Sequence, residues 1–595
     1  MSDISISFYD DTYIETFFNK IFPKFPYDLI VNILQFLSIP EILVLQSLIE
    51  DNYVKRIRIN QIKKHRLSII CDSIDFDEEI DKKFLQIKQM FQTIVRLTKS
   101  DPHNIIPVDI TFFCESMVID CLDDWLDNAT NFDIVLILYR CHCFELQNYK
   151  KSSMITKIYV EHSACESSQD FRLDFSIYSN LKEIEYCCGY LKSLNLDSSF
   201  ETLTSLAIPD IYSQEYLSRF INLKHLKIEF QEDFHIKKLP RNILTLWLEG
   251  LYVNSDIIIQ SSDDWPKNLN SLSIIMGANF RSESISSYKL PSNLESLTIN
   301  SVEVSNIFPE FPSLLRDLEL QSHSKNPLYF SSILEMGYRK LVLDGFIPVD
   351  DSISSLKVAQ GLEELSFVFP SCSFSLDSID FEGAKSTLRS LSLAFKNYQC
   401  SFTRVNFGEF SKLKSIKLEG CNIELENLIL PTCLNELEIE FDHFTSIDDN
   451  CPLFSNPYIY SRLQSLKFSS CQVGFISPNV SLPINLRTLF IPHCNDVRFL
   501  SNVINHTSLN HFGIWKLTSF EIFDDLEIFN TEGSSNFTTN INKLEFEIYC
   551  TPFTDSIIEN FYNQIESTFR KKIANRKVCE KLRSYQILDL VPKFD

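Results

Sequence analysis

The stretch LKSIKLEGCNI, residues 413–423, carries the pattern that decides the fold of this chain. Its apolar residues stand at the first, fourth and sixth positions (Leu413, Ile416 and Leu418), and Cys421 stands at the ninth. Because side chains alternate along a strand, Ile416 and Leu418 should point to one side and the polar residues around them to the other. One such unit cannot bury its apolar face alone, so the sequence predicts that copies stack side by side.

The same apolar pattern recurs along most of the chain. Copies begin at Leu181, Leu191, Leu203, Leu223, Ile243, Leu269, Leu294, Leu315, Tyr338, Leu362, Leu388, Leu413, Leu434, Leu463, Leu486, Leu509 and Ile541. From Leu203 onward the steps between copies are 20 to 29 residues, except for the last one. The starts at Leu181, Leu191 and Leu203 are too close together, so one of them is expected to be spurious or to belong to an irregular end. Residues 155–160 fit an earlier, degenerate copy.

This spacing resembles that of leucine-rich repeats, whose period is about 20 to 29 residues and which place Asn or Cys at the ninth position. A Pro-x-x-Leu or Pro-x-x-Ile lead precedes five copies, as in irregular repeats of the fungal and amoebal kind (Pro240, Pro266, Pro291, Pro431 and Pro483). The resemblance implies an α/β solenoid over residues 151–550, with one curved parallel sheet inside and mostly turns and short helices outside. Residues 551–595 are expected to form a helix that caps the last repeat.

Composition narrows the class of protein further. The 595 residues carry a formal net charge of -24, which argues against nucleic-acid binding because a polyanionic duplex is bound through Lys and Arg. The 17 cysteines form no CxxC pair and follow no secretory signal, so reduced thiols and a cytoplasmic or nuclear location are expected. The apolar stretches at 30–49 and 132–139 are interrupted or too short to cross a bilayer, so no membrane association is expected.

Residues 25–45, FPYDLIVNILQFLSIPEILVL, indicate two helices with almost no loop between them. Apolar residues at helical spacing predict a first helix over 27–37. Ser38 and Glu41 form a Ser-x-x-Glu capping box for a second helix, and Pro40 lies in its first turn, where a missing N–H costs nothing. Such a pair exposes more Leu and Ile than it can cover, which is typical of a partner-binding surface.

This hairpin resembles an F-box, whose pattern opens with Leu-Pro-x-Glu/Asp-Leu and continues through Ile-Leu-x-x-Leu to an acidic residue and two aliphatics. Phe25 and Pro26 stand for the opening pair. The resemblance implies that residues 1–54 bind the Skp-type adaptor of a cullin-RING ubiquitin ligase, and that the repeats select a protein substrate. The adaptor-binding side chains would be Pro26, Leu29, Ile30, Ile33, Leu34, Leu37, Ile42 and Leu43. The alternatives are a capped hairpin inside the domain and, for the whole chain, an interaction scaffold with no role in ubiquitination.

Residues 55–150 are interpreted as a helical connector. Acids at the start and bases at the end of residues 77–99 agree with the dipole of a helix, and residues 115–126 fit another helix. Phe132–Tyr139 is predicted to be a buried strand at the transition to the repeats. Cys141, His142 and Cys143 lack a second pair of ligands, so ordinary thiols are favoured over zinc, and no metal or cofactor is expected.

The sequence shows no linear catalytic motif beyond what chance would produce. The sequence contains no phosphate-binding glycine loop, no His-Glu-x-x-His and no Gly-x-Ser-x-Gly, so a non-catalytic protein is expected. An enzyme is the weaker alternative, because distant residues can form a site without a linear motif.

The third, fifth and seventh positions of each copy should line the concave face of the sheet. Acidic residues there are Glu183, Glu185, Asp197, Glu229, Glu249, Asp317, Glu319, Asp344, Glu364, Glu419, Glu436, Glu438, Glu440, Glu545 and Glu547, against Lys227, Lys340, Lys417, Lys467 and Lys543. This excess predicts either an ordinary solvated surface or a basic protein partner. The substrate-binding candidates are clustered acids and large aromatics: Trp247, Asp317, Glu319, Glu436, Glu438, Glu440, Phe490 and Trp515.

Overall fold

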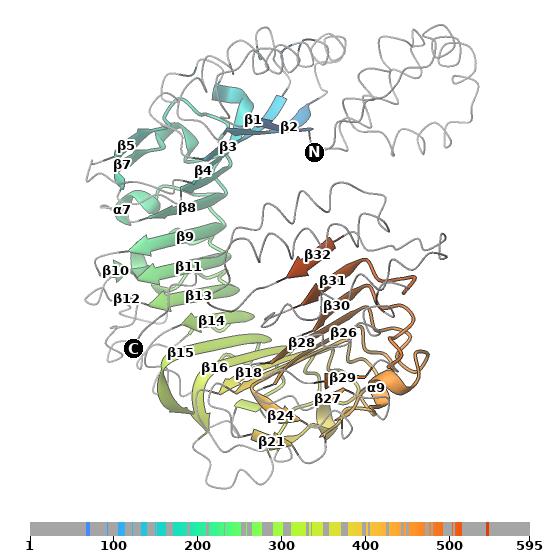
Figure 1. Ribbon diagram of the computed structural model, residues 1–595. Coiled ribbons are helices and arrows are strands. Elements are labelled where there is room, and N and C mark those ends of the chain that lie inside the picture. The colour runs from blue at the N-terminus through green and yellow to red at the C-terminus, as the bar shows by residue number, and fades with distance from the viewer. Residues whose placement is uncertain are drawn as a thin grey trace, which may run out of the picture. The chain divides into compact units, whose positions relative to one another are not determined.

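A computed structural model gives the fold of the chain (Figure 1). It describes residues 67–71, 88, 92, 105–112, 122, 126, 132–139, 149, 152–161, 171–186, 191–209, 214–230, 233–250, 257–258, 264–276, 290–300, 311–328, 333–334, 336–348, 356–369, 379–395, 400–402, 405–423, 428–441, 446–447, 451–470, 475–477, 480–491, 503, 506–514 and 543–546. The chain divides into two compact units, Met1–Leu294 and Glu295–Asp595.

The first unit is built on a sheet in which all neighbouring strands run parallel. In their order across the sheet, the strands are β1 (Leu67–Cys71), β2 (Ile106–Phe112), β3 (Phe132–Tyr139), β4 (Ile155–Glu161), β6 (Glu183–Tyr186), β8 (Ser205–Pro209), β9 (His225–Phe230), β11 (Thr245–Gly250) and β13 (Ser271–Met276). Each strand therefore follows its sequence neighbour across the sheet, which is the arrangement of a solenoid.

The second unit repeats this plan, again with parallel neighbours only. Its strands are β14 (Ser296–Asn300), β15 (Asp317–Leu328), β16 (Lys340–Pro348), β18 (Glu364–Phe369), β20 (Ser390–Phe395), β23 (Ser415–Glu419), β26 (Glu436–Phe441), β28 (Ser465–Ser470), β30 (Thr488–Ile491), β31 (His511–Ile514) and β32 (Lys543–Phe546). The copies beginning at Leu294, Leu315 and Leu362 thus contribute β14, β15 and β18 to one parallel sheet, as predicted.

Short pieces of structure connect the main strands. Two-stranded parallel ladders pair β5 (Phe171–Asp174) with β7 (Leu191–Asn195), β10 (Phe234–His235) with β12 (Ile257–Ile258), β17 (Leu356–Lys357) with β19 (Ile379–Asp380), β21 (Cys400–Phe402) with β24 (Cys421–Ile423), β22 (Val405–Asn406) with β25 (Leu428–Ile429), and β27 (Ser446–Ile447) with β29 (Phe475–Ile476). The bounded helical segments are η4 (Ser152–Met154), η5 (Asp197–Ser199), α7 (Gln214–Leu217), η6 (Ile236–Lys238), η10 (Glu382–Ala384) and α9 (Pro452–Ser455). Each is a single turn, so the described part of the chain is a β-solenoid with few helices rather than an α/β fold.

The leucine pattern becomes the core through the register of the strands. Ile416 on β23 pairs with Leu391 on one side and Leu437 on the other, and Leu418 two residues later aligns with Leu393 in the same way. All of these side chains are at most 1% exposed. Equivalent positions of successive repeats therefore stack in continuous apolar rows, and each buried aliphatic side chain contributes about 1.5–3 kcal/mol of transfer free energy.

Turns before the strands explain the proline lead. The N–H of the first leucine of the repeat bonds to the proline carbonyl three residues earlier at Leu269, Leu294, Leu434 and Leu486, with N···O distances of 3.1, 3.2, 3.1 and 3.0 Å. The same bond joins Leu315 to Pro312 at 3.0 Å. The fixed φ of proline suits such a tight turn, which delivers the chain into the next strand.

Asparagine provides a second recurrent contact, which the sequence analysis did not identify. Directly before the first apolar residue of a copy, an Asn side-chain amide donates to a backbone carbonyl of the preceding turn. The donors are Asn180, Asn222, Asn242, Asn293 and Asn485, at 2.7–3.1 Å from the accepting oxygen. These bonds satisfy turn carbonyls that no ladder reaches, so they link consecutive turns along the solenoid.

The crowded starts near the beginning of the array are now resolved. Strands of the main sheet begin two residues after Leu181 and Leu203, whereas the copy at Leu191 forms β7, which pairs with β5 in a separate two-stranded ladder. Leu191 is therefore the spurious start. Asp197, counted from it, belongs to η5 and does not lie on the face of the main sheet. The degenerate copy at residues 155–160 is confirmed as strand β4.

The helical connector is wrong for two segments of residues 55–150, which form strands β1 and β2. Strands β1, β2 and β3 all lie in the main sheet, so its described part already includes Leu67 and does not begin near residue 151. The strand predicted at Phe132–Tyr139 is confirmed. Lys88 and Leu122, inside the two predicted helices, are helical. The predicted adaptor-binding hairpin and the C-terminal helix lie outside the described residues.

No helix in the described part of the chain is long and apolar enough to span a membrane.

Candidate functional site

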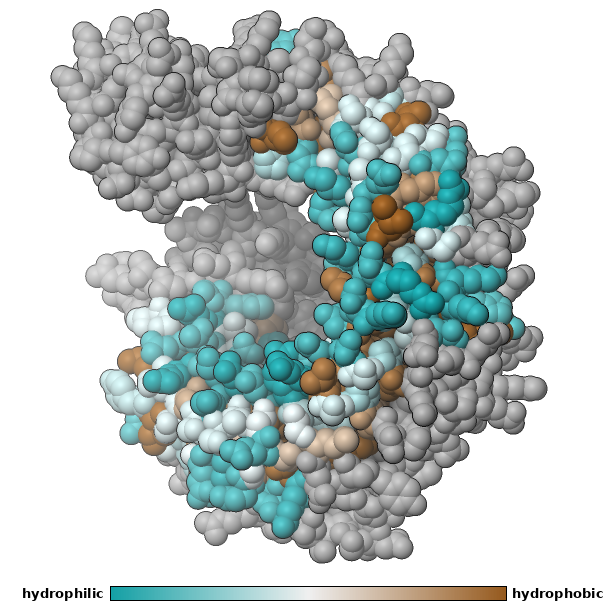
Figure 2. Space-filling model, turned by 180° about the vertical axis from the view of Figure 1, so that it is seen from behind, coloured by the Kyte–Doolittle hydropathy of each residue, from teal (hydrophilic) through white to brown (hydrophobic). Residues whose placement is uncertain are grey.

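The open face of the sheet is the candidate binding surface. We define it as the side of the main strands opposite the apolar rows, which carries the third, fifth and seventh positions of each repeat. Alternation along the strands gives it partly exposed residues, as in the iBiBi pattern of burial along β14 and β23. In Figure 2, hydrophilic residues cover most of the described surface on view, and apolar residues are scattered among them.

In the first unit, Trp247 is a large aromatic on this face. It lies on β11 between Lys227 of β9 and Ser273 of β13, and 38% of its surface is exposed. The Lys227 ammonium lies 5.1 Å from the centre of the indole ring, a cation–π distance. A small neighbour on one side and a flexible lysine on the other leave the ring accessible to a ligand.

Two carboxylates adjoin this aromatic residue. Glu229 and Glu249 occupy paired positions on β9 and β11, two residues beyond Lys227 and Trp247. Burial and the charge of Glu249 raise the pKa of Glu229 above its ordinary value, and the Lys227 ammonium opposes that shift. A cation supplied by a ligand would relieve the repulsion between the two carboxylates, so this position favours positive charge.

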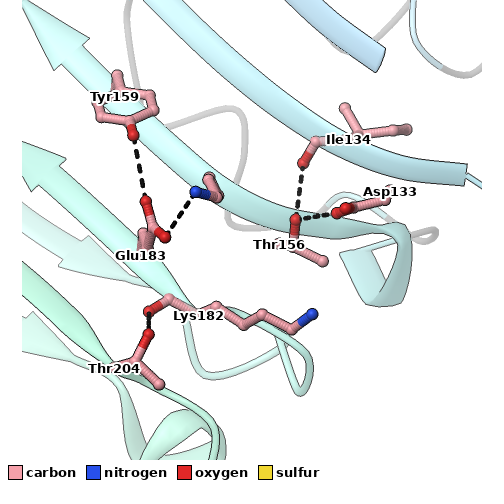
Figure 3. Close-up of polar contacts among 8 residues, drawn as sticks. Asp133, Ile134, Thr156, Tyr159, Lys182, Glu183 and Thr204 are labelled. Atoms are coloured by element: carbon pink, nitrogen blue, oxygen red, sulfur yellow. Dashed lines mark hydrogen bonds and ion pairs between the residues drawn. The ribbon is translucent and has the colours of Figure 1, made fainter. Parts of the chain in front are cut away.

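Nearer its N-terminal end, the first unit pairs its charges internally (Figure 3). Glu183 on β6 is held by Lys157 of β4 at 2.5 Å and by the hydroxyl of Tyr159 at 3.2 Å. Thr156 donates to Asp133 on the adjacent strand β3. These side chains form a polar ladder between successive repeats, which fixes Glu183 and leaves it little capacity to bind a partner.

Two acidic candidates on β15 are also paired. Asp317 accepts two hydrogen bonds from the Arg339 guanidinium, at 3.0 and 2.5 Å. Glu319 lies 3.9 Å from the Lys340 ammonium and accepts a hydrogen bond from Gln321 at 2.7 Å. Their charges are therefore largely compensated within the second unit.

The cluster on β26 lies between two lysines. Glu438 contacts Lys417 of β23 at 3.2 Å and Lys467 of β28 at 3.6 Å, and Lys417 also contacts Glu419 at 2.5 Å. The exposed Glu436 accepts a longer hydrogen bond of 3.4 Å from Ser415. Glu440 lies on the same strand and face. The cluster keeps a negative excess, but smaller than the sequence indicated.

Of the other predicted aromatics, Phe490 is buried, with only 6% of its surface exposed. Its ring packs edge-on against His511 at 4.8 Å, and Lys467 lies 5.9 Å from its centre. The prediction that Phe490 anchors a partner is therefore wrong in this structure. Trp515 lies outside the described residues.

Sequence reasoning missed two of the cations that neutralise the open face. Lys157 lies on β4, in the degenerate copy that was left out of the charge count. Arg339 stands directly before β16, at the second position of its copy, which the count of third, fifth and seventh positions leaves out, but its long side chain reaches Asp317 on the neighbouring strand. Counting the position before each strand as well would have found Arg339.

Within the described ranges, no three His, Cys, Asp or Glu side chains are grouped so that they could hold a metal ion.

Comparisons with known proteins were made for the whole chain. No protein-family model and no curated protein match it. A solved structure of a leucine-rich-repeat protein of Leptospira interrogans is 16% identical and gives a TM-score of 0.35, over 73% of this chain and 98% of that chain. A protein described as a novel circular leucine-rich-repeat structure is 14% identical with a TM-score of 0.34, over 77% of this chain and 68% of that chain.

The class of the protein follows from its own strands. Parallel strands that succeed one another along the sequence, with leucines stacked in rows and turns between them, define a β-solenoid of the leucine-rich-repeat type.

Proposed function

We propose that this chain is a protein-interaction subunit whose open face binds a partner protein. The observation that supports this most directly is Trp247, a large aromatic kept 38% exposed on a largely polar face. Tryptophan is enriched among the residues that dominate binding energy, because it buries a large apolar area with few rotatable bonds.

A partner with a basic segment fits the surroundings of Trp247 best. Glu229 and Glu249 lie side by side, and Lys227 is the cation that faces them from the same two strands. A lysine or arginine of the partner could bind these carboxylates while an apolar side chain packs on the indole ring. In the second unit, the exposed Glu436 offers a further site for positive charge.

We further propose that residues 1–54 attach this subunit to the Skp-type adaptor of a cullin-RING ubiquitin ligase, so that the bound partner becomes its substrate. The support is the sequence pattern of residues 25–45, which resembles an F-box. Burying the aliphatic side chains of the two predicted helices would be the main source of affinity for the adaptor.

One experiment tests both parts of the proposal. The tagged full chain is purified from cells, and bound proteins are quantified by mass spectrometry. Changing Leu29→Asp together with Ile33→Asp should remove the adaptor and the cullin but leave the partner bound. Trp247→Ala should leave the adaptor bound and reduce the partner by about tenfold or more, the loss typical of an interface hot spot.

A matched control is Ile177→Ala. Ile177 is as exposed as Trp247, at 39%, but lies in the turn before β6 rather than on the open face. It should bind both proteins as the wild type does. Adaptor retained by the Leu29 and Ile33 double variant would refute the ligase assignment and leave an interaction scaffold. Unchanged partner recovery with Trp247→Ala would refute the open face as the binding site.

A further inference from the structure

The turns of the second unit carry a basic surface, opposite in charge to the acidic open face. We define the turn edge as residues 412–414, 458–464 and 484–487, which lead into β23, β28 and β30. Backbone hydrogen bonds join the residues that precede successive strands. Asn435 N–H donates to Lys414, Gln464 to Asn435, and Arg487 to Gln464, each at 2.8 Å. These residues therefore stand in one row along the edge of the sheet.

Four cations are exposed on this edge: Lys412, Lys414, Arg462 and Arg487. None of the four forms an ion pair with an acidic group in the part of the chain that the structure describes. Arg389, one strand earlier in the same row, is different because it contacts Glu363 at 3.5 Å. In a chain with a net charge of -24, acids are abundant enough to neutralise such a group, so the lack of ion pairs at these four cations, within the described residues, marks the edge as distinct.

Exposed apolar side chains lie among these cations. Tyr458 is 66% exposed, more than any other large apolar residue of the described ranges, and Ile459 and Ile484 are 43% and 37% exposed. The two turns that carry them are in contact, because Ile484 N–H donates to the Pro457 carbonyl at 3.1 Å and the Asn485 amide donates to Ser461. The three exposed side chains therefore stand on two adjoining turns, which also carry Arg462 and Arg487, and we call them the apolar patch.

We propose that this turn edge binds an acidic peptide segment that also carries apolar side chains, on a partner distinct from the one at the open face. Arg462 and Arg487 can each hold a carboxylate through two parallel hydrogen bonds. The apolar patch then gains contact area that a polyanion without apolar side chains could not supply. This combination favours a protein segment over a nucleic acid.

The spacing of the cations sets the length of the ligand. Lys414 and Arg487 are separated by three strand intervals of about 4.8 Å, or roughly 14 Å. An extended peptide advances about 3.4 Å per residue, so acidic side chains about four residues apart would reach both. The apolar residues between those acids would lie over Tyr458 and Ile484.

The proposal is tested by fluorescence anisotropy with the full chain. One labelled peptide of about ten residues carries glutamates about four residues apart with Leu and Phe between them, and a second replaces the glutamates with glutamines, so that it carries no positive charge for the open face. The acidic peptide should bind at least about tenfold more tightly than the neutral one, and added salt should weaken its binding. Lys414→Glu combined with Arg487→Glu should weaken it by a further tenfold or so.

The matched control is Lys237→Glu combined with Lys357→Glu. It makes the same change in net charge at two exposed lysines, in η6 and β17, that lie off the edge. It should change the affinity by less than about twofold. Tyr458→Ser combined with Ile484→Ser should weaken the acidic peptide about fivefold while keeping its salt dependence, because these side chains contribute only apolar area.

Several outcomes would overturn the proposal. One is that the two peptides bind the chain with equal affinity. Another is that the control variant weakens binding of the acidic peptide as much as the edge variant does. A third is that the Tyr458 and Ile484 variant binds the acidic peptide as tightly as the wild type. Stronger binding of a single-stranded RNA oligonucleotide than of the acidic peptide would do the same and assign the edge to nucleic acid. If the Glu variants lose their circular-dichroism signal, Lys414→Gln with Arg487→Gln gives the same test without adding negative charge.

Discussion

His506 shows how one residue couples this fold to pH. Its Nε2 lies 3.0 Å from the Pro483 carbonyl, and its Nδ1 accepts the Ser508 N–H at 3.3 Å. One nitrogen therefore donates and the other accepts, which is the pattern of a neutral imidazole. Burial lowers the pKa of His506 below its ordinary value, and the hydrogen bond to Pro483 only partly opposes that shift.

The folded state therefore resists protonation of His506 more than the unfolded chain does. As the pH falls below about 6.5, the unfolded state takes up the proton first, so stability is lost down to the lower folded pKa and then levels off. His506→Gln removes this term. We expect the stability of the wild type relative to the variant, measured by urea unfolding, to fall between pH 7.5 and 5. A constant difference across that range would contradict the assignment.

Trp247 and Phe490 show what residue patterns can and cannot predict. The alternation of each strand placed both on the open face, and the register confirms that placement. Their exposure depends on neighbours from other repeats: Ser273 beside Trp247 is small, whereas His511 packs against Phe490. The pattern of a single sequence gives the direction in which a side chain points but not the size of its neighbours from other repeats. The placement of both residues on the open face could therefore be predicted, but their exposure could not.

Among the structural elements, the turns are specified by the sequence as strongly as the strands are. Asn242 donates to the Ile221 carbonyl at 2.8 Å and so ties one turn to the preceding one. Asn242→Ala should lower the free energy of unfolding by about 1 kcal/mol, the usual net value of such a bond. The measurement is the midpoint of urea unfolding.

Asn270→Ala is the matched control for this change. Asn270 is exposed just before β13, and no hydrogen bond of its side chain is found among the described residues. Its replacement should shift the midpoint by much less. Equal shifts for the two variants would mean that the effect comes from the intrinsic preference of asparagine for turns rather than from the bond between repeats.

Strands β1 and β2 are the elements that the sequence pattern missed. Their sequences, LSIIC and IPVDITF, are apolar and β-branched, but neither has the leucine spacing of the later copies. They also stand on either side of residues 77–99, whose charges and apolar stripe favour a helix. Pairing of β1 with β2, and of β2 with β3, makes them strands of the main sheet, although 34 residues separate β1 from β2. Such long-range pairing leaves little trace in a local pattern.

For the whole molecule, the leading consequence of this architecture is that coupling runs from neighbour to neighbour. In the second unit, β23 pairs with β20 on one side and β26 on the other. The stability of such an array is approximately a sum of repeat and interface terms. Damage to one repeat should therefore weaken its neighbours first.

Leu418→Ala tests this at the centre of the second unit. Leu418 is fully buried, so the truncation should cost about 2–5 kcal/mol through lost apolar contact and an unfilled cavity. Hydrogen exchange followed by mass spectrometry should show the largest loss of protection in β20, β23 and β26, decreasing toward β14 and β32. Leu314→Ala, at a residue that is 51% exposed, is the control and should leave exchange nearly unchanged. A uniform loss across all strands of this unit would instead indicate one cooperative block, because in a nearest-neighbour array the disturbance must fade with the number of interfaces it crosses.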